Sequence, residues 1–230
     1  MRLVIVDLDG TLLPCGSEAR FIVHLFASGQ IGPKALIRSL LFAVRHWPRF
    51  GRHVWKKNKS YLAGMRCTEV ERLAHAFVTE RLVPLLRERL HERIACHRAA
   101  GDHVLLMTGS PEFLARPLAQ AIAADSWIAT SCAHEDGIYL ASVPTCHPFG
   151  GEKLRLAQDA ARRLGFSLAE GMAYADTGED IELLAAVGDA VAVAPDRMLA
   201  KRARSEGWEI ISEKQILPAR RSLAGIGQRA

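Results

Sequence analysis

Short apolar runs alternate with segments of helical periodicity, and this alternation restricts the fold more than any other feature of the sequence. The runs have the length of buried strands and cover Leu3–Val6, Val104–Met107, Met172–Ala175, Val191–Val193 and Glu209–Ile211. Apolar residues recur at helical spacing in Glu112–Ala123, Lys153–Leu164, Ile181–Val187 and Arg197–Ser205. Such alternation predicts an α/β fold in which helices cover both faces of a parallel sheet. In these sheets, functional residues lie beyond the carboxyl ends of the strands.

The first two strands are separated by about ninety residues, far more than one crossover helix requires. Apolar residues in this interval follow helical spacing at 36–44 and at 70–77, and glycine and proline interrupt the pattern. We therefore expect a helical cap at residues 15–85, inserted into a catalytic core made of residues 1–14 and 86–212. Residues 213–230 are expected to form a basic C-terminal tail.

The composition excludes several classes of protein. The 230 residues are 49% hydrophobic and 24% charged, which suits one domain with a modest insertion and excludes a disordered chain. Five scattered cysteines without a C-x-x-C pair predict neither a disulfide framework nor a zinc site. No apolar run approaches the ~18 residues of a transmembrane helix, and no secretory signal is recognisable. We expect a cytoplasmic protein.

Two carboxylates, Asp7 and Asp9, follow directly after the first predicted strand. A tight turn there directs both side chains toward one pocket. One carboxylate can attack phosphorus, and a second one beside it can protonate the leaving oxygen and later activate water. The alternative is an ordinary polar strand end with an Asp-Gly turn.

Further polar residues follow two of the later strands and begin one helix. Thr108, Gly109 and Ser110 come before Pro111, which can start a helix whose amino terminus favours an anion. Alone, this segment also suits any strand-to-helix turn, and a lone lysine such as Lys153 is usually a solvated surface residue.

Asp176 and Asp180 follow the strand Met172–Ala175. Bringing these carboxylates together with Asp7 is strongly unfavourable unless a cation lies among them. Carboxylates, a carbonyl and waters form an all-oxygen site, which suits Mg²⁺.

Together these segments resemble the four motifs of the haloacid dehalogenase superfamily, in the family's order. The matching segments are D-x-D-G-T from Asp7, T-G-S-P from Thr108, G-G-E-K ending at Lys153, and A-D-T-G-E-D from Ala175, where the family usually has glycine. The resemblance covers residues 1–14 and about 90–212. It implies a Rossmann-like, three-layer parallel-sheet core with an inserted helical cap, as in the branch that contains the phosphoserine phosphatases.

The resemblance also implies roles for the motif residues. Asp7 is the nucleophile that forms an aspartyl phosphate, and Asp9 is the general acid and base. Because the family's dehalogenases and phosphonate hydrolases lack the second acid, Asp9 favours phosphate esters. The other two residues assigned to catalysis are Thr108 and Lys153. The residues assigned to phosphate binding are Thr11, Gly109 and Ser110. The residues assigned to Mg²⁺ are Asp7, Asp9 through its backbone carbonyl, Asp176 and Asp180.

The cap sequence bears on the substrate. Between Glu18 and Glu69 the chain has no acidic residue, yet ten of its 30 Lys and Arg residues lie there, with several aromatic residues among them. This composition suits an anionic amphiphile or an anionic membrane surface. With T-G-S-P, the long apolar and basic cap also resembles the phosphatidylglycerophosphate phosphatases of the superfamily. We expect a phosphorylated small-molecule or lipid substrate and peripheral contact of the basic cap with the inner membrane surface.

Other interpretations stay open. Leu36–Val44 can instead pack within the cap, with solvated arginines around it. Phosphoserine phosphatases hold their substrate with a Glu after the first motif and an Arg in the cap, which Glu18 and Lys56–Lys59 resemble only loosely. A phosphoserine or histidinol phosphate substrate, or a phosphomutase, shares all four motifs. Nucleic-acid binding does not require the four motifs in register, so no nucleic-acid partner is expected. The oligomeric state stays open.

Overall fold

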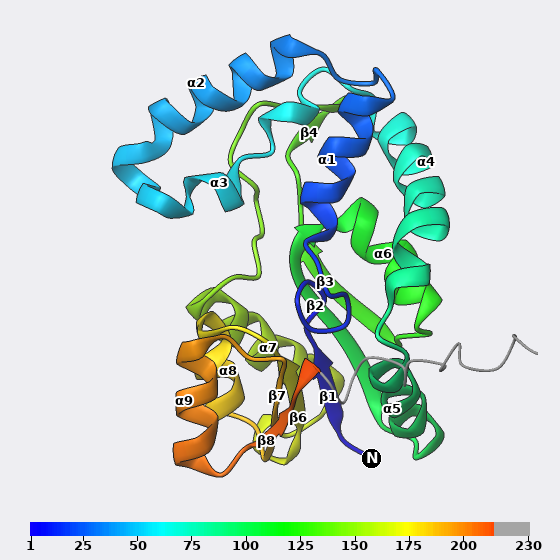
Figure 1. The fold of residues 1–230 in the computed structure, drawn as a ribbon, viewed down its shortest axis with the longest axis vertical. Coiled ribbons are helices and arrows are strands. Elements are labelled where there is room, and N and C mark those ends of the chain that lie inside the picture. The colour runs from blue at the N-terminus through cyan, green and yellow to red at the C-terminus, as the bar shows by residue number, and fades with distance from the viewer. Residues whose placement is uncertain (214–230) are drawn as a thin grey trace, which may run out of the picture.

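A computed structural model describes residues 1–213 of the chain (Figure 1). The predicted basic tail at 213–230 therefore lies outside the described residues, apart from Glu213. The main strands are β1 (Leu3–Val6), β2 (His103–Pro111), β3 (Ser126–Thr130), β6 (Met172–Ala175), β7 (Asp189–Val193) and β8 (Glu209–Ile211). The α-helices are α1 (Ser17–Ala27), α2 (Pro33–Phe50), α3 (Val54–Lys57), α4 (Cys67–Phe77), α5 (Glu88–Ala99), α6 (Glu112–Ala121), α7 (Gly151–Leu164), α8 (Ile181–Ala185) and α9 (Arg197–Glu206).

The six main strands form one parallel sheet in the order β3-β2-β1-β6-β7-β8. β1 lies at the centre, and its four residues are apolar and buried, as expected for a strand covered on both faces. Leu3 is in register with His103 of β2, and Val4 with Met172 of β6. This arrangement brings the ends of β1, β2 and β6 to one edge of the sheet.

Helices cover both faces of the sheet, which confirms the predicted three-layer α/β fold. On one face, α7, α8 and α9 bury small and branched residues such as Ala157, Leu184 and Leu199 against the strands. On the other face, α5 and α6 contribute Ile94 and Leu118 to a second apolar cluster. Asp196 caps α9 by accepting a hydrogen bond from Leu199 N at 2.8 Å, which fixes where α9 begins.

The helices α1 to α4 lie between β1 and β2 in the chain and rise above one end of the sheet (Figure 1). Phe21 of α1 and Phe77 of α4 belong to the same apolar cluster as the sheet face that α5 and α6 cover. In contrast, α2 and α3 are anchored by a separate small cluster around Phe42, Ala43 and Val54. Within residues 1–213, no helix is both long and apolar enough to cross a membrane.

The structure departs from the predicted elements at several places. β2 extends to Pro111, so the segment Thr108–Pro111 forms the last part of the strand instead of following it. The apolar run stops at Met107 because Thr108, Gly109 and Ser110 follow it, and the register with β3 also shifts between Met107 and Pro111. The strand β3 and the hairpin of β4 (His134–Glu135) and β5 (Ile138–Tyr139) were not predicted, because the apolar run of β3 has only three residues and β4 and β5 have two residues each. Pro48, expected to interrupt the helical pattern, lies in the last turn of α2.

Candidate active site

Asp7 directly continues β1, and its backbone N–H donates to the carbonyl oxygen of Tyr174 on β6 at 3.0 Å. The side chain is buried. The chain then turns at Gly10, whose φ is 91°, a backbone conformation that glycine adopts readily. Leu13 N closes this turn by donating to the carbonyl oxygen of Leu8 at 2.8 Å. The turn places Asp9 beside Asp7 at the same edge of the sheet, as the sequence predicts.

Lys153 reaches Asp7 from the first turn of α7. Its Nζ lies 2.6 Å from Asp7 Oδ1 and 3.0 Å from Asp180 Oδ2, and the lysine side chain is buried. Burial alone lowers the pKa of Lys153, but the two carboxylates outweigh it and raise that pKa. Lys153 therefore stays protonated and positively charged. Burial raises the pKa of Asp7 to about 7, although the Lys153 charge opposes the rise.

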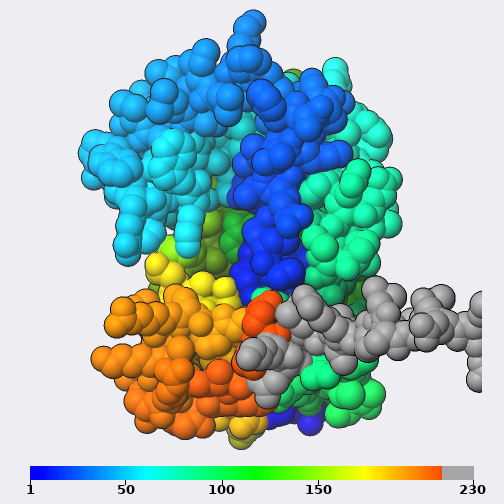
Figure 2. Space-filling model, viewed as in Figure 1, coloured from blue at the N-terminus to red at the C-terminus, as the bar shows by residue number. Residues whose placement is uncertain are grey.

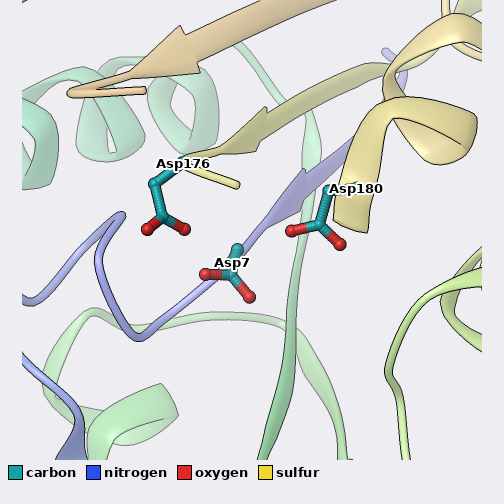
Figure 3. A group of neighbouring side chains, drawn as sticks. All are labelled: Asp7, Asp176 and Asp180. Carbon is teal, nitrogen blue, oxygen red and sulfur yellow. The ribbon is translucent and has the colours of Figure 1, made fainter. Parts of the chain in front are cut away.

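Asp176 and Asp180 complete an acidic cluster with Asp7 (Figure 3). One carboxylate oxygen from each residue lies within 4.8 Å of those from the other two. Figure 3 shows the three side chains, from the ends of β1 and β6 and from the following turn, directed toward a common space. Burial raises the pKa of Asp176 to about 6, with an opposing hydrogen bond from Thr11 Oγ1 at 3.2 Å. Three clustered carboxylates with hard oxygen donors match the ligand preference of Mg²⁺.

The side chain of Asp9 is held away from this cluster by hydrogen bonds. Its Oδ1 accepts from Ser17 N at 2.7 Å, and its Oδ2 accepts from the hydroxyl of Ser110. The Ser17 hydroxyl lies 2.7 Å from Ser110 Oγ and, because the Ser110 proton is directed to Asp9, Ser17 donates. Burial raises the pKa of Asp9, and the bonds from Ser110 and Ser17 partly counteract this rise. A raised pKa favours the protonated carboxyl group, which is the form that a general acid requires.

The end of β2 lines the same site. Thr108 is buried, and its Oγ1 accepts a hydrogen bond from Ser110 N at 3.0 Å, so its hydroxyl proton stays available to another acceptor. The carbonyl oxygen of Gly109 accepts from Thr130 Oγ1 at 2.6 Å, which fixes the orientation of this peptide.

A cleft of about 470 Å³ joins these elements. The predicted site residues on its surface are Asp7, Asp9, Thr108, Gly109, Ser110, Lys153, Asp176 and Asp180. Thr11 is the predicted residue that does not line the cleft. It is fully buried, and its Oγ1 donates a hydrogen bond to Asp176 Oδ1.

The cap contributes one wall of the cleft. Trp55 and Lys56 of α3 and Ile22 of α1 line it. Lys56 Nζ lies 3.8 Å from the centre of the Phe149 ring, which precedes α7, so the two parts of the chain touch across the cleft. Figure 2 shows α2 and α3 overhanging the lower part of the molecule on this side.

Several site residues were not found from the sequence. Arg87 is buried, and its Nη1 donates to the carbonyl oxygens of Gly10 and Thr11 at 2.7 and 3.1 Å. It holds the turn that carries the first motif. Nothing in the sequence marks this arginine among its many cations, because its role depends on long-range packing. Ser17 was missed for the same reason.

Glu18, which is partly buried, forms an ion pair with the buried Lys59 in the cap, and Tyr61 donates to Glu18 Oε1 at 2.9 Å. Glu18 and the segment Lys56–Lys59 loosely resemble the Glu and Arg that hold the amino acid in phosphoserine phosphatases. In the structure Glu18 and Lys59 satisfy each other, and of these two only Glu18 is part of the cleft lining. The pair fixes α1 to the segment that follows α3.

His147 is a further residue of the cleft that the sequence did not single out. Its Nδ1 lies 2.8 Å from Thr130 Oγ1, whose own proton is directed to Gly109. Nδ1 must therefore carry the imidazole proton and donate it. Burial lowers the pKa of His147 to about 3, so the ring is neutral at neutral pH. Its Nε2 is buried and has no hydrogen-bond partner among the described residues.

Comparison with known sequences defines the class of protein. A sequence model of the haloacid dehalogenase-like hydrolase family matches residues 4–185, so the chain belongs to this family. The resemblance drawn from the four motifs is thereby confirmed. The chain is an enzyme of the phosphatase type found in that family.

Two relatives illustrate its place within the family. A protein of Mycobacterium tuberculosis (strain ATCC 25618 / H37Rv), named "Probable phosphatase", is 29% identical over 215 residues, which cover 90% of this chain and 73% of that protein. The histidinol-phosphatase of Neisseria meningitidis serogroup C is 26% identical over 220 residues, covering 93% and 99%.

Solved structures share the fold. A protein of unknown function from Bordetella pertussis superimposes with a TM-score of 0.79 at 27% identity, covering 92% of this chain and 98% of that one. A phosphoserine phosphatase, solved as an analogue of its phospho-aspartyl intermediate, gives 0.60 at 16% identity, covering 92% and 93%. The fold is thus that of the phosphoserine-phosphatase-like branch.

Proposed function

We propose that the protein is a Mg²⁺-dependent phosphomonoester hydrolase that works through an aspartyl phosphate on Asp7. The observation that carries this proposal is the buried contact between Asp7 and Lys153, at 2.6 Å, beside two further carboxylates. The lysine keeps the Asp7 carboxylate oriented and balances charge that collects when a phosphate group enters. A structural ion pair alone does not require Asp176 and Asp180 in the same place.

The metal-binding part of the proposal rests on the donor set. Asp7, Asp176 and Asp180 supply clustered carboxylate oxygens, and the backbone carbonyl of Asp9 is proposed as a further ligand. When bound, Mg²⁺ neutralises charge on the phosphate oxygens and offsets the repulsion among the carboxylates.

The chain's own groups supply the remaining chemistry. An oxygen of Asp7 forms a bond to phosphorus while the bond from phosphorus to the ester oxygen breaks, and Asp9 gives its proton to that oxygen. Asp9 then takes a proton from water as the water oxygen bonds to phosphorus, which releases phosphate and restores the Asp7 carboxylate. The hydroxyl of Thr108 is free to donate to a phosphate oxygen. Ser110 orients Asp9, and Thr11 orients Asp176.

The experiment is phosphate release from a soluble aryl phosphate, combined with acid quenching to trap phosphoenzyme from a labelled substrate. Wild type is expected to release phosphate and to carry label, and Asp7→Asn is expected to do neither while keeping its far-ultraviolet circular dichroism. Asp9→Asn should accumulate label because its second step is slow. Turnover by a clean preparation of Asp7→Asn would refute the nucleophile assignment. Formation of a phosphorylated isomer without free phosphate would instead indicate a phosphomutase.

For the substrate, the proposal favours a phosphate ester with an apolar portion, such as the lipid phosphatidylglycerophosphate. The cleft places Ile22, Trp55 and Phe149 on the same surface as the acidic cluster. An apolar wall next to a phosphate site suits a leaving group that carries hydrocarbon. The protein is further proposed to work at the cytoplasmic face of the membrane, where such a substrate is anchored.

The alternative is a small, soluble phosphate, as the names of the histidinol-phosphatase and phosphoserine phosphatase relatives suggest. Against phosphoserine, the charge of the Glu18 carboxylate is already balanced by Lys59, and Tyr61 donates to its other oxygen, so it has no free charge for a substrate ammonium group.

A substrate panel separates the two. Short-chain phosphatidylglycerophosphate is expected to give a higher kcat/KM than phosphoserine or histidinol phosphate, and Trp55→Ala should lower only the lipid value. A higher kcat/KM for a soluble phosphate would make the cap an ordinary lid.

A further inference from the structure

The outward face of α2 is apolar. Six large side chains on this helix are between 53% and 67% exposed: Leu36, Ile37, Leu40, Leu41, Val44 and Trp47. We call this set the α2 ridge. The opposite face of α2 is the buried one, where Ala35, Phe42 and Ala43 pack. Figure 1 shows α2 as the outermost helix above the sheet, with its outer side uncovered by other elements.

The spacing of the ridge makes it a continuous stripe. Leu36, Leu40 and Val44 recur every four residues, and Ile37 and Leu41 lie one position along, so all share one side of the helix. A helix at a water-exposed surface normally carries polar residues on this side. Six exposed apolar side chains on one stripe therefore indicate an interaction surface that a binding partner or a membrane covers.

Cations flank the ridge. Lys34, Arg45 and Arg49 lie on one edge of the helix and are exposed, and Arg52 follows directly after it. Among residues 1–213, none of these four forms an ion pair with a carboxylate. Because no acidic residue occurs between Glu18 and Glu69, the positive charge of this edge is not neutralised along the chain.

We propose that the α2 ridge and its flanking cations dock the protein on an anionic phospholipid membrane. The apolar stripe enters the boundary between headgroups and acyl chains, while Lys34, Arg45 and Arg49 contact lipid phosphates. Trp47, near the end of the ridge, suits the headgroup region. The whole surface lies parallel to one helix, which is the geometry of an interfacial helix and not of a spanning one.

Charge argues against two other occupants. A second copy of this chain on the same surface would bring basic edge against basic edge. Residues 214–230 of the chain contain Lys and Arg and no Asp or Glu, so they repel the same edge. Anionic lipid is the occupant whose charge and apolar character both match.

The docking surface continues toward the cleft. Trp55 on α3 is exposed, and it also lines the cleft that holds Asp7. Docking through α2 therefore places the entrance lined by α3 close to membrane lipids. This consequence rests on the proposed phosphatase function, whereas the docking itself does not.

The test is co-sedimentation of the full chain with vesicles of phosphatidylglycerol and phosphatidylcholine, compared with phosphatidylcholine alone. Wild type and Asp7→Asn are expected to bind the anionic vesicles equally, and binding should fall at high salt. The double variant L40E/L41E and the double variant R45E/R49E should each lose at least about tenfold in partition coefficient. Equal binding of wild type to both kinds of vesicle overturns the proposal.

Matched controls lie on α7, far from the ridge. Leu164 and Arg163 are exposed there, so L164E and R163E introduce the same types of change at a surface without a ridge. Both should bind vesicles as wild type does. All ridge variants should hydrolyse a soluble aryl phosphate at the wild-type rate, which shows that they fold. If L40E/L41E instead dissociates a dimer and wild type ignores vesicles, the ridge is a contact between copies, and the membrane proposal is wrong.

Discussion

Gly10 and Asp176 approach so closely that a Cβ atom at Gly10 would lie 1.9 Å from Oδ2 of Asp176. The backbone of Gly10 is also in the left-handed region, with φ at 91°. Gly10→Ala must therefore displace the Asp176 carboxylate or the turn that follows β1. Because a displacement of about 1 Å at a reacting centre costs on the order of 100-fold in rate, we expect kcat to fall by about that factor.

The matched control for this change is Gly101→Ala. Gly101 has a similar φ of 82°, but a Cβ atom there meets nothing within 4 Å. Both variants should lose about 1 kcal/mol of stability from backbone strain, and only Gly10→Ala should lose activity. Thermal unfolding and aryl phosphate hydrolysis measure the two effects. Equal activity in the two variants would show that the approach to Asp176 is irrelevant to catalysis.

The acidic cluster predicts how stability depends on pH when Mg²⁺ is removed. Burial raises the pKa of Asp7 to about 7 and that of Asp176 to about 6, from 3.8. Between about pH 4 and 7, the folded state therefore binds more protons at these groups than the unfolded state, and stability falls as the pH rises through this range. In a chelator, the unfolding temperature should be higher near pH 5 than near pH 8.

Mg²⁺ should reverse this loss at pH 8, because a bound cation stabilises the ionised carboxylates. Asp176→Asn removes one of the three charges, so this variant should show a flatter pH dependence and a smaller response to Mg²⁺. Differential scanning fluorimetry with and without Mg²⁺ at several pH values measures both. A wild-type protein whose unfolding temperature ignores Mg²⁺ at pH 8 would contradict the proposed metal site.

Arg87 lies outside the four motifs, but we expect the structure of the active site to depend on it. Its guanidinium donates to the carbonyl oxygens of Gly10 and Thr11, so Arg87→Met leaves one buried and one partly buried acceptor without their donor. We expect a loss of about 3 kcal/mol in the free energy of unfolding and a large fall in kcat. Urea unfolding measures the first effect.

Arg155→Met is the control for Arg87. Arg155 also donates to two acceptors, which are the carboxylates of Glu152 and Asp159, but its side chain is exposed on α7. Exposed ion pairs contribute little, so this variant should resemble wild type in both measurements. If Arg87→Met is as stable and active as Arg155→Met, the arginine does not hold the turn.

The comparison of sequence and structure shows which features local pattern can carry. The bounds of β1, β6 and β8 were predicted from their apolar runs, and the clustering of Asp7 with Asp176 followed from the parallel sheet that these strands form. Lys153 lies on α7, and its place beside Asp7 was expected only from the resemblance to the family. The unpredicted β3 lies at the edge of the sheet and carries polar and exposed residues. Its existence depends on pairing with β2, which no local pattern records.

The cap shows a second feature that the local sequence pattern cannot predict. Helical spacing in Leu36–Val44 was recognised, but spacing cannot say whether an apolar stripe faces the protein or the solvent. In α2 both sides of the helix carry apolar residues, and only the packing of Phe42 and Ala43 against Val54 decides which side is buried. The Asp9 network has the same character, because Ser110 lies 101 residues away from Asp9 in the chain.

His147 provides a last prediction, in which two substitutions separate its two ring nitrogens. Nδ1 donates to Thr130, which in turn holds the Gly109 peptide at the end of β2, while Nε2 has no partner among the described residues. Asn can supply an N–H near the position of Nδ1, whereas Phe can supply none.

His147→Asn should therefore keep kcat within a few-fold of wild type, and His147→Phe should lower it about tenfold, the cost of roughly one hydrogen bond. Because burial lowers the pKa of His147 to about 3, neither variant should shift the pH profile of kcat between pH 5 and about pH 8. An equal fall of kcat in both variants would assign the function to Nε2. So would a change in the pH dependence of kcat near neutral pH. Either result would exclude a role for the hydrogen-bond chain from His147 through Thr130 to Gly109.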